Sequence, residues 1–115
     1  CGDGLQAVRN HIYEHPLTSP GEADLSALVD FHDLKQAIQM TLDGRLQADG
    51  PVTQAEFLGR LGIVERASRL MAANPASAAQ IETGTARLMS PQGMGTRFKA
   101  IGVRSSQLPV LPGFA

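Results

Sequence analysis

The stretch that decides the fold is Gly50-Pro51-Val52-Thr53-Gln54-Ala55-Glu56-Phe57-Leu58-Gly59-Arg60-Leu61-Gly62-Ile63. Glu56 follows Thr53 by three residues, which is the spacing of a capping box. In that motif the threonine hydroxyl binds one free amide of the first helical turn, and the glutamate carboxylate binds the amide of the cap residue. Gly62 suits the left-handed turn that ends a helix. The apolar residues between them recur at helical spacing: Phe57, Leu58 and Leu61. The stretch therefore predicts a strand end, a tight turn and a short helix that faces a core, and it indicates no chemistry.

The residues on either side alternate between extended and helical patterns. Before the stretch we expect strands at Leu5–Val8, Leu25–Val29 and Arg45–Thr53, a loop at Asn10–Gly21, and a helix over Phe31–Leu42 that Asp30 caps and Gly44 closes. After it we expect helices over Val64–Met71 and Ala78–Leu88, with Asn74-Pro75 as the boundary between them, and a strand at Phe98–Val103. The order predicts an α/β fold with few strands and helices packed on them. Residues 1–104 would form the domain and residues 105–115 a loose tail.

Composition excludes several classes of partner. Ten basic residues balance eleven acidic ones, and there is no tryptophan, so we expect no nucleic-acid partner. No apolar run is long enough to span a membrane. A single cysteine allows no intrachain disulfide, and this favours a reducing, cytoplasmic compartment.

Cys1 at the start of the sequence allows two interpretations. One is a processed lipoprotein anchored through this cysteine, because a lipoprotein signal peptide ends directly before such a residue. The other is a piece of a longer protein. The second is favoured, since the predicted strands are too few and too separated for a self-sufficient sheet and would leave a bare edge.

Two groups of residues resemble a metal-binding or a catalytic pattern, but we expect no metal site and no catalytic nucleophile at either. His11 and His15 have the spacing of two ligands on one helix face, yet Ile12 stands where a zinc protease needs its glutamate and Pro16 marks a loop. Loop histidines are therefore expected, with Glu14 beside them, and no metal site. Cys1 paired with a histidine would be a nucleophile without an orienting group, so an inert cysteine is expected.

Asp24 and Asp30 are the candidate catalytic residues. They flank Leu25–Val29, and if that segment is extended their even separation places both carboxylates on one face. Paired carboxylates bind a guanidinium or ammonium group through charge-assisted hydrogen bonds. The alternative is that Asp30 caps the next helix and Asp24 ends a loop.

No nucleotide-sized cofactor has a predicted site here. Gly2-Asp3-Gly4 and Gly93-Met94-Gly95-Thr96 are glycine-containing turns, but neither is a G-x-G-x-x-G loop after a strand and neither precedes a Walker lysine. We therefore expect no cofactor-binding residues in this chain.

Several phrases, in order along the chain, resemble one family. Gly2 to Ala7 resembles "GDTLQA", Pro20 to Phe31 resembles "PGEADLTAHVDF", Gly50 to Ile63 resembles "GPVTQGxFLxxLGI", Met94 to Lys99 resembles "MGTxFK", and Leu111 to Phe114 resembles the family's ending. The family is that of the MidA-type S-adenosylmethionine-dependent methyltransferases.

The resemblance implies a C-terminal fragment of a Rossmann-like class I methyltransferase. It implies S-adenosylmethionine as the cofactor of the full-length protein, and none for this chain alone, because the family's cofactor loop lies in the N-terminal half. It implies methylation of a protein side chain, arginine in the mitochondrial relative that assists assembly of respiratory complex I, so a complex I subunit is one expected partner. Asp24 and Asp30 would orient the guanidinium, and the chain would supply late strands and acceptor-side surface.

Three of the positions at which the sequence departs from the quoted phrases are Gly4, Ser26 and Leu28. Gly4 and Ser26 replace threonines, and Leu28 replaces a histidine. The lost histidine leaves open a second hypothesis, a non-catalytic module for partner binding or assembly that is derived from the same fold.

Overall fold

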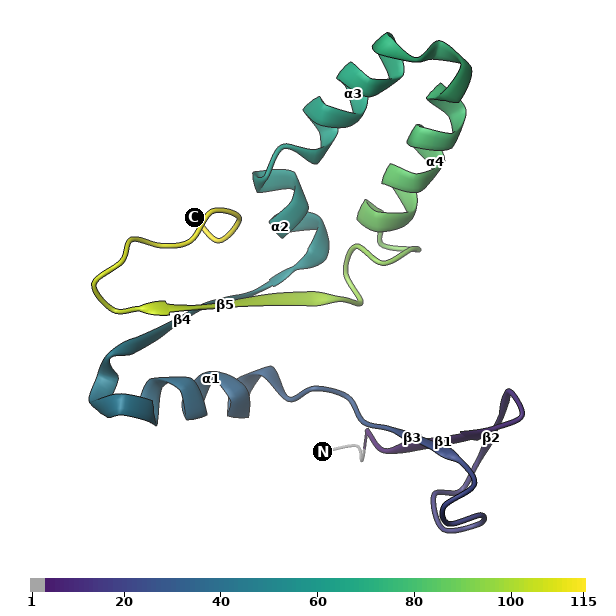
Figure 1. Ribbon diagram of the computed structural model, residues 1–115, viewed down its shortest axis with the longest axis vertical. Helices are drawn as coiled ribbons and strands as arrows, with labels where there is room; N and C mark the ends of the chain where they lie inside the picture. The colour runs from purple at the N-terminus through teal and green to yellow at the C-terminus, as the bar shows by residue number, and fades with distance from the viewer. Residues whose placement is uncertain (1–3) are drawn as a thin grey trace. The chain divides into compact units, whose positions relative to one another are not determined.

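The computed structural model describes residues 4–115, apart from the side chain of Leu42. The chain divides into two compact units, Cys1–Asp30 and Phe31–Ala115, which we call the small unit and the large unit. Strands and helices are mixed along the chain in an α/β fold (Figure 1), which confirms the predicted class. The division falls inside the predicted 1–104 domain, whose boundary stays a prediction. None of the helices within residues 4–115 is long and apolar enough to cross a membrane.

The small unit is an antiparallel sheet with strand order β2-β1-β3. Its strands are β1 (Gln6–Arg9), β2 (Ile12–Glu14) and β3 (Asp24–Ser26). Asn10 and His11 join the first two with φ values of 51° and 63°, the left-handed conformation that a two-residue hairpin turn requires. The predicted loop over residues 10–21 is thus wrong at β2, because a strand of three residues is too short to show alternation.

The pairing register assigns side chains to the two faces of this sheet. Ala7 lies opposite both Glu14 and Leu25, and Val8 lies opposite Tyr13 and Asp24. Directly paired residues share a face, and neighbours along a strand alternate. One face, which we call the Ala7 face, therefore carries Ala7, Arg9, Ile12, Glu14 and Leu25. The opposite face, which we call the Tyr13 face, carries Gln6, Val8, Tyr13, Asp24 and Ser26.

The large unit is built on an antiparallel ribbon of β4 (Leu46–Thr53) and β5 (Lys99–Ser105). The register shifts between Asp49 and Val52, where Gly50 has φ 92° and precedes a cis proline bond. A Cβ atom at Gly50 would lie 2.9 Å from the carbonyl oxygen of Ala100, so only glycine fits this bulge. Both strands confirm the extended segments predicted from the sequence.

Helix α1 (Phe31–Met40) packs against β4. Phe31, Lys35 and Ile38 are its half-buried residues, and their spacing is that of one helix face. The Lys35 ammonium donates a hydrogen bond of 2.9 Å to the carbonyl oxygen of Gly50, so the helix contacts the bulge of the ribbon directly.

The predicted end of α1 is wrong by a few residues. The α-helix stops at Met40 and a 3₁₀ turn, η1 (Thr41–Gly44), follows. The Thr41 hydroxyl donates to the carbonyl oxygen of Ala37 at 2.6 Å, and Asp43 and Gly44 both take left-handed φ values, 52° and 79°. The tighter 3₁₀ turn therefore replaces the α-helix before Gly44 is reached.

Helix α2 (Gln54–Arg60) begins with the predicted capping box. The Thr53 hydroxyl accepts the Glu56 amide at 3.1 Å, and Glu56 Oε2 accepts the Thr53 amide at 2.9 Å. Gly62, with φ 81°, separates α2 from α3 (Ile63–Ala73) as expected.

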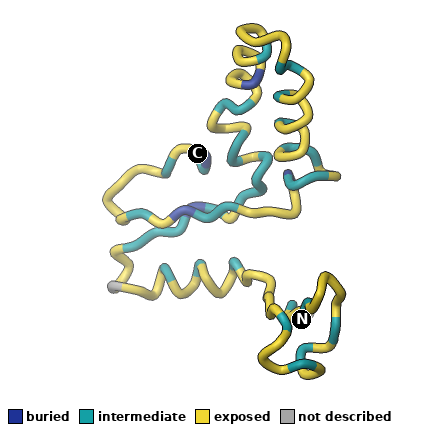
Figure 2. The backbone as a smooth tube through the Cα atoms, turned by 45° about the vertical axis from the view of Figure 1, so that its right-hand side comes forward, coloured by how far each residue is buried: buried dark blue, intermediate teal, exposed yellow. Residues whose placement is uncertain are grey.

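Helices α3 and α4 (Ala78–Met89) pack against each other as a helical hairpin (Figure 1). The predicted boundary at Asn74-Pro75 is confirmed in place, but a 3₁₀ turn, η2 (Pro75–Ser77), precedes the α-helix, and the Asn74 side chain makes no cap bond. In both views α1 lies on one side of the ribbon and α2 to α4 on the other (Figures 1 and 2).

Few side chains are buried. Among the described residues, Ala7 and Ala67 are the buried apolar ones, while Leu28 and Met40 are 80% and 82% exposed. The tube in Figure 2 is correspondingly mostly exposed or intermediate. A chain of this length ordinarily buries a larger core, so much apolar surface of this protein is uncovered.

The segment after β5 returns to the ribbon and α2. The Phe114 ring lies 5.2 Å from that of Phe57, centroid to centroid, with the planes inclined at 50°. Gly113 has φ 87°, and a Cβ atom there would approach the Phe57 ring to 2.5 Å. These contacts attach part of the segment that the sequence predicts as a loose tail.

Candidate functional site

Asp24 and Asp30, the two candidate catalytic carboxylates, are both exposed in the small unit. Asp24 begins β3 opposite Val8, and Asp30 directly precedes α1. The strand ends at Ser26, and residues 27–30 have no regular structure, so even spacing no longer places the two carboxylates on one face. Their proposed roles stay predictions.

The His11, Glu14 and His15 group is divided between a turn and a strand. His11 lies in the β1–β2 turn, and His15 Nδ1 accepts the Leu17 amide at 3.2 Å, as a loop histidine does. Glu14 Oε1 is buried and has no hydrogen-bond partner within the part of the chain that the structure describes. No three His, Cys, Asp or Glu side chains of residues 4–115 gather as a metal ion would need. Cys1 and the Gly2-Asp3 turn lie outside the described residues.

A buried ionic cluster in the large unit is the feature that sequence reasoning missed. Asp49 is 8% exposed, and both its carboxylate oxygens lie 3.0 Å from Arg104 Nε. Its Oδ2 also accepts the Leu111 amide at 3.0 Å, and Arg104 Nη1 donates to the carbonyl oxygen of Leu108. The cluster therefore ties the segment after β5 to both strands of the ribbon.

The electrostatics of this cluster keep Asp49 ionised. The Leu111 amide, first, and then the Arg104 guanidinium lower the pKa of Asp49 below its ordinary value, while burial opposes them. A carboxylate that is held ionised by hydrogen bonds is a poor proton acceptor, and the contacts of this cluster serve to position the backbone of the segment after β5. The only local signal was an aspartate inside a strand, and its partner stands 55 residues away.

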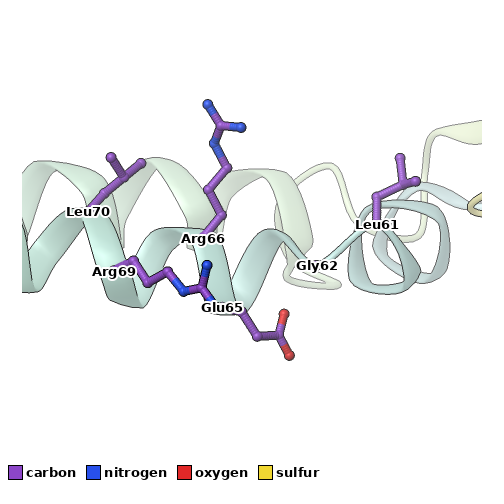
Figure 3. A pocket seen from close by; sticks show the side chains of 6 residues that line it. All are labelled: Leu61, Gly62, Glu65, Arg66, Arg69 and Leu70. Carbon is purple, nitrogen blue, oxygen red and sulfur yellow. The ribbon is translucent and has the colours of Figure 1, made fainter.

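A surface pocket of about 410 Å³ lies where α2 meets α3, lined by Leu61, Gly62, Glu65, Arg66, Arg69 and Leu70. Figure 3 shows the side chains of Glu65 and Arg66 pointing to opposite sides of the helix. Sites for small molecules need a few polar groups that converge on one point. This pocket is therefore a poor ligand site and has the character of a solvated helix face.

A second pocket of about 250 Å³ lies along the seam of α3 and α4, between residues such as Ala67, Met71 and Met89. Helices form both pockets, and neither contains a glycine-rich loop at the end of a strand, the element that holds nucleotides in Rossmann-like folds. Neither of these two pockets fits S-adenosylmethionine, and we derive no step of a reaction through it.

Comparisons with known proteins identify the family. Residues 1–52 match the model of the family described as "Putative S-adenosyl-L-methionine-dependent methyltransferase". The mitochondrial protein arginine methyltransferase NDUFAF7 of Rattus norvegicus is 41% identical over 98 residues, which cover 84% of this chain and 22% of the rat protein. The chain belongs to this methyltransferase family.

One further relative agrees in sequence, and a solved structure agrees in fold. The NDUFAF7 homologue of Drosophila melanogaster is 36% identical over 96% of this chain and 26% of its own length. A "likely methyl transferase" of Burkholderia thailandensis, solved with S-adenosyl-homocysteine bound, matches 97% of this chain with a TM-score of 0.73 and 24% identity. The match covers 28% of that protein, so the fold found here is that of a part of the methyltransferase fold. The chain spans about a quarter of the length of its relatives.

The family also corrects one expectation. The single cysteine favoured a cytoplasmic compartment, but the rat, mouse and human relatives are named as mitochondrial proteins. The cytoplasmic prediction is therefore wrong. Cysteine content separates oxidising from reducing compartments and carries no information about which reducing compartment a protein enters.

Proposed function

We propose that this chain is the C-terminal part of an S-adenosylmethionine-dependent protein arginine methyltransferase. The observation that carries the proposal is the 41% identity, over 84% of the chain, to a protein named as an arginine methyltransferase. The S-adenosyl-homocysteine bound to the Burkholderia neighbour supports the cofactor, since that molecule is the product left after S-adenosylmethionine gives up its methyl group. The chain would supply late strands of the fold and surface on the acceptor side.

Methyl transfer to an arginine side chain requires acidic residues near the guanidinium. A charged guanidinium is a weak nucleophile, so an arginine methyltransferase has to orient it and disperse its charge with carboxylates. Asp24 and Asp30 are the proposed residues, and their exposure in the small unit leaves them accessible to an arginine of a protein acceptor. A respiratory complex I subunit is the proposed acceptor, on the strength of the mitochondrial relatives.

A segment exchange tests this proposal. We would replace the matching segment of the rat relative with this chain and measure methylarginine in its acceptor protein by mass spectrometry. We expect methyl transfer that requires S-adenosylmethionine. A hybrid that folds and binds S-adenosylmethionine but forms no methylarginine would contradict the catalytic assignment.

The second candidate is a non-catalytic module for partner binding or assembly. Leu28 favours it, because this residue stands where the resembling phrase has a histidine and is 80% exposed. Restoring that histidine with Leu28→His in the hybrid separates the two proposals. A large rise in methyl transfer would show that the natural chain has lost a catalytic group, whereas unchanged transfer leaves the enzyme proposal standing.

A further inference from the structure

Within the small unit, the Ala7 face carries two exposed apolar side chains, and burial is confined to its centre. Ile12 and Leu25 on this face are 69% and 61% exposed, although Ala7 between their strands is only 1% exposed. A sheet of three short strands needs an apolar face packed against another layer to be stable in water. Ala7 is the one buried apolar residue among the described residues of the small unit, so the unit's own residues do not supply that layer.

Glu14 gives this face a second, independent feature. Its Oε1 is buried, and residues 4–115 provide it with no hydrogen-bond partner. A buried carboxylate oxygen without a hydrogen-bond donor lowers the free energy of unfolding, because it has lost its bonds to water. Arg9 on the same face does not supply the donor, because its guanidinium binds Glu22 at 2.7 Å and the Ser19 hydroxyl at 3.1 Å. A cation from outside the described residues would satisfy Glu14 once the carboxylate turns from its buried position toward that cation.

The Tyr13 face differs in composition. Gln6, Asp24 and Ser26 surround Val8 and Tyr13 there, so the face is largely polar and suits solvent. An antiparallel sheet commonly packs its apolar face on the core and leaves the polar face in water. The Ala7 face is accordingly the one to be covered.

We propose that the Ala7 face packs against the part of a methyltransferase chain of this family that the present sequence does not include, and that a lysine or arginine of that part binds Glu14. This rests on the proposed function. The present chain spans only 22% to 28% of its relatives, so most of their fold remains available as the covering layer. A second copy fits less well, because a symmetric contact would bring the two Glu14 carboxylates toward each other.

Co-expression tests the docking face. The chain would be tagged and produced with the part of the rat relative that lies outside the 98 matching residues. We expect the two to copurify, and we expect Ile12→Asp and Leu25→Asp to reduce copurification at least tenfold. Tyr13→Asp is the matched control, since Tyr13 is 73% exposed, lies next to Ile12 and points to the other face. It should copurify as the wild type does.

Three outcomes would overturn the proposal: no copurification with the wild type, equal loss in Tyr13→Asp and Ile12→Asp, or a dimer of the chain alone that Ile12→Asp dissociates. Hydrogen exchange of the β1 amides in each variant reports whether the sheet still forms, and Leu25→Ala replaces Leu25→Asp if it does not. Copurification needs neither cofactor nor acceptor, so it can succeed while the proposed enzyme activity fails.

Glu14→Gln tests the ion pair. It keeps the shape of the side chain and removes its charge, so affinity for the same partner should fall about tenfold and become less sensitive to salt. Glu22→Gln is the control, because Glu22 is already paired within the small unit. Equal affinities of wild type and Glu14→Gln would refute the role given to Glu14.

Discussion

Replacing Thr53 with alanine should destabilise the large unit by about 1 kcal/mol, the usual cost of losing a threonine N-cap. The structure shows what is lost. The Thr53 hydroxyl accepts the Glu56 amide at 3.1 Å and also contacts Glu56 Oε2 at 3.1 Å. Helix α2 has only seven residues, so a single cap satisfies a large share of its free amides.

Urea denaturation followed by circular dichroism measures this effect. With a slope of about 2 kcal/mol per molar urea, 1 kcal/mol lowers the midpoint by about 0.5 M. Thr53→Ser is the control, because serine caps as well as threonine, and its midpoint should match the wild type. An unchanged midpoint in Thr53→Ala would refute the assignment of the cap.

Low pH should reduce the difference in unfolding stability between Thr53→Ala and wild type. The Thr53 amide, first, and then its hydroxyl lower the pKa of Glu56. A carboxyl group whose pKa is lower in the folded state stabilises the fold above its unfolded pKa, and this contribution is lost as the pH falls through the folded value. Thr53→Ala keeps the backbone amide and removes only the hydroxyl, so the difference between Thr53→Ala and wild type should shrink by the hydroxyl's share alone as the pH falls through the folded-state pKa of Glu56.

Four further predictions concern the ionic cluster, the segment after β5, the carboxylates and the cofactor. The pKa of Asp49 is lowered below its ordinary value of 3.8, so its stabilisation is complete above that pH and is lost as the pH falls through the folded-state pKa; urea midpoints of wild type and Asp49→Asn should differ at pH 7 and converge in stronger acid. Gly113→Ala should lower the melting temperature more than Gly44→Ala, because both positions have positive φ but only the former Cβ meets an aromatic ring; equal losses would show that the ring moves aside. In an active hybrid, Asp24→Asn should slow methyl transfer about tenfold or more at unchanged melting temperature, whereas Asp30→Asn should be nearly silent, since asparagine caps a helix as well. The isolated chain should not bind S-adenosylmethionine in titration calorimetry, and saturable micromolar binding would show that a cofactor site has been overlooked.

Short-range sequence patterns explain which features could be predicted from the sequence. The capping box, the turn at Gly62 and the two ribbon strands depend on residues within a few positions of one another, and each is present in the structure. The family, too, could be identified from short phrases in order along the chain. Features of this kind need no knowledge of distant partners.

Two kinds of feature could not be predicted from the sequence: contacts between residues far apart in the chain, and strands too short to show a periodic pattern. Asp49 and Arg104 are 55 residues apart, and only the pairing of β4 with β5 brings them together. Strand β2 has three residues and β3 ends after three, so neither shows a period, and the shared face assumed for Asp24 and Asp30 depended on a longer strand. Which surface another part of the protein covers is not encoded in local spacing at all.

The bond from the Leu111 amide to Asp49 also constrains when the large unit can finish folding during synthesis. Leu111 follows Asp49 by 62 residues, and at 5–20 residues per second the ribosome needs roughly 3–12 s to make that interval. During this time β4 has already been made, but the aspartate inside it lacks both the Arg104 guanidinium and the Leu111 amide. The nascent large unit is therefore exposed to proteases and to aggregation until its last contacts emerge, and slowing translation between these two residues should lower the yield of folded protein.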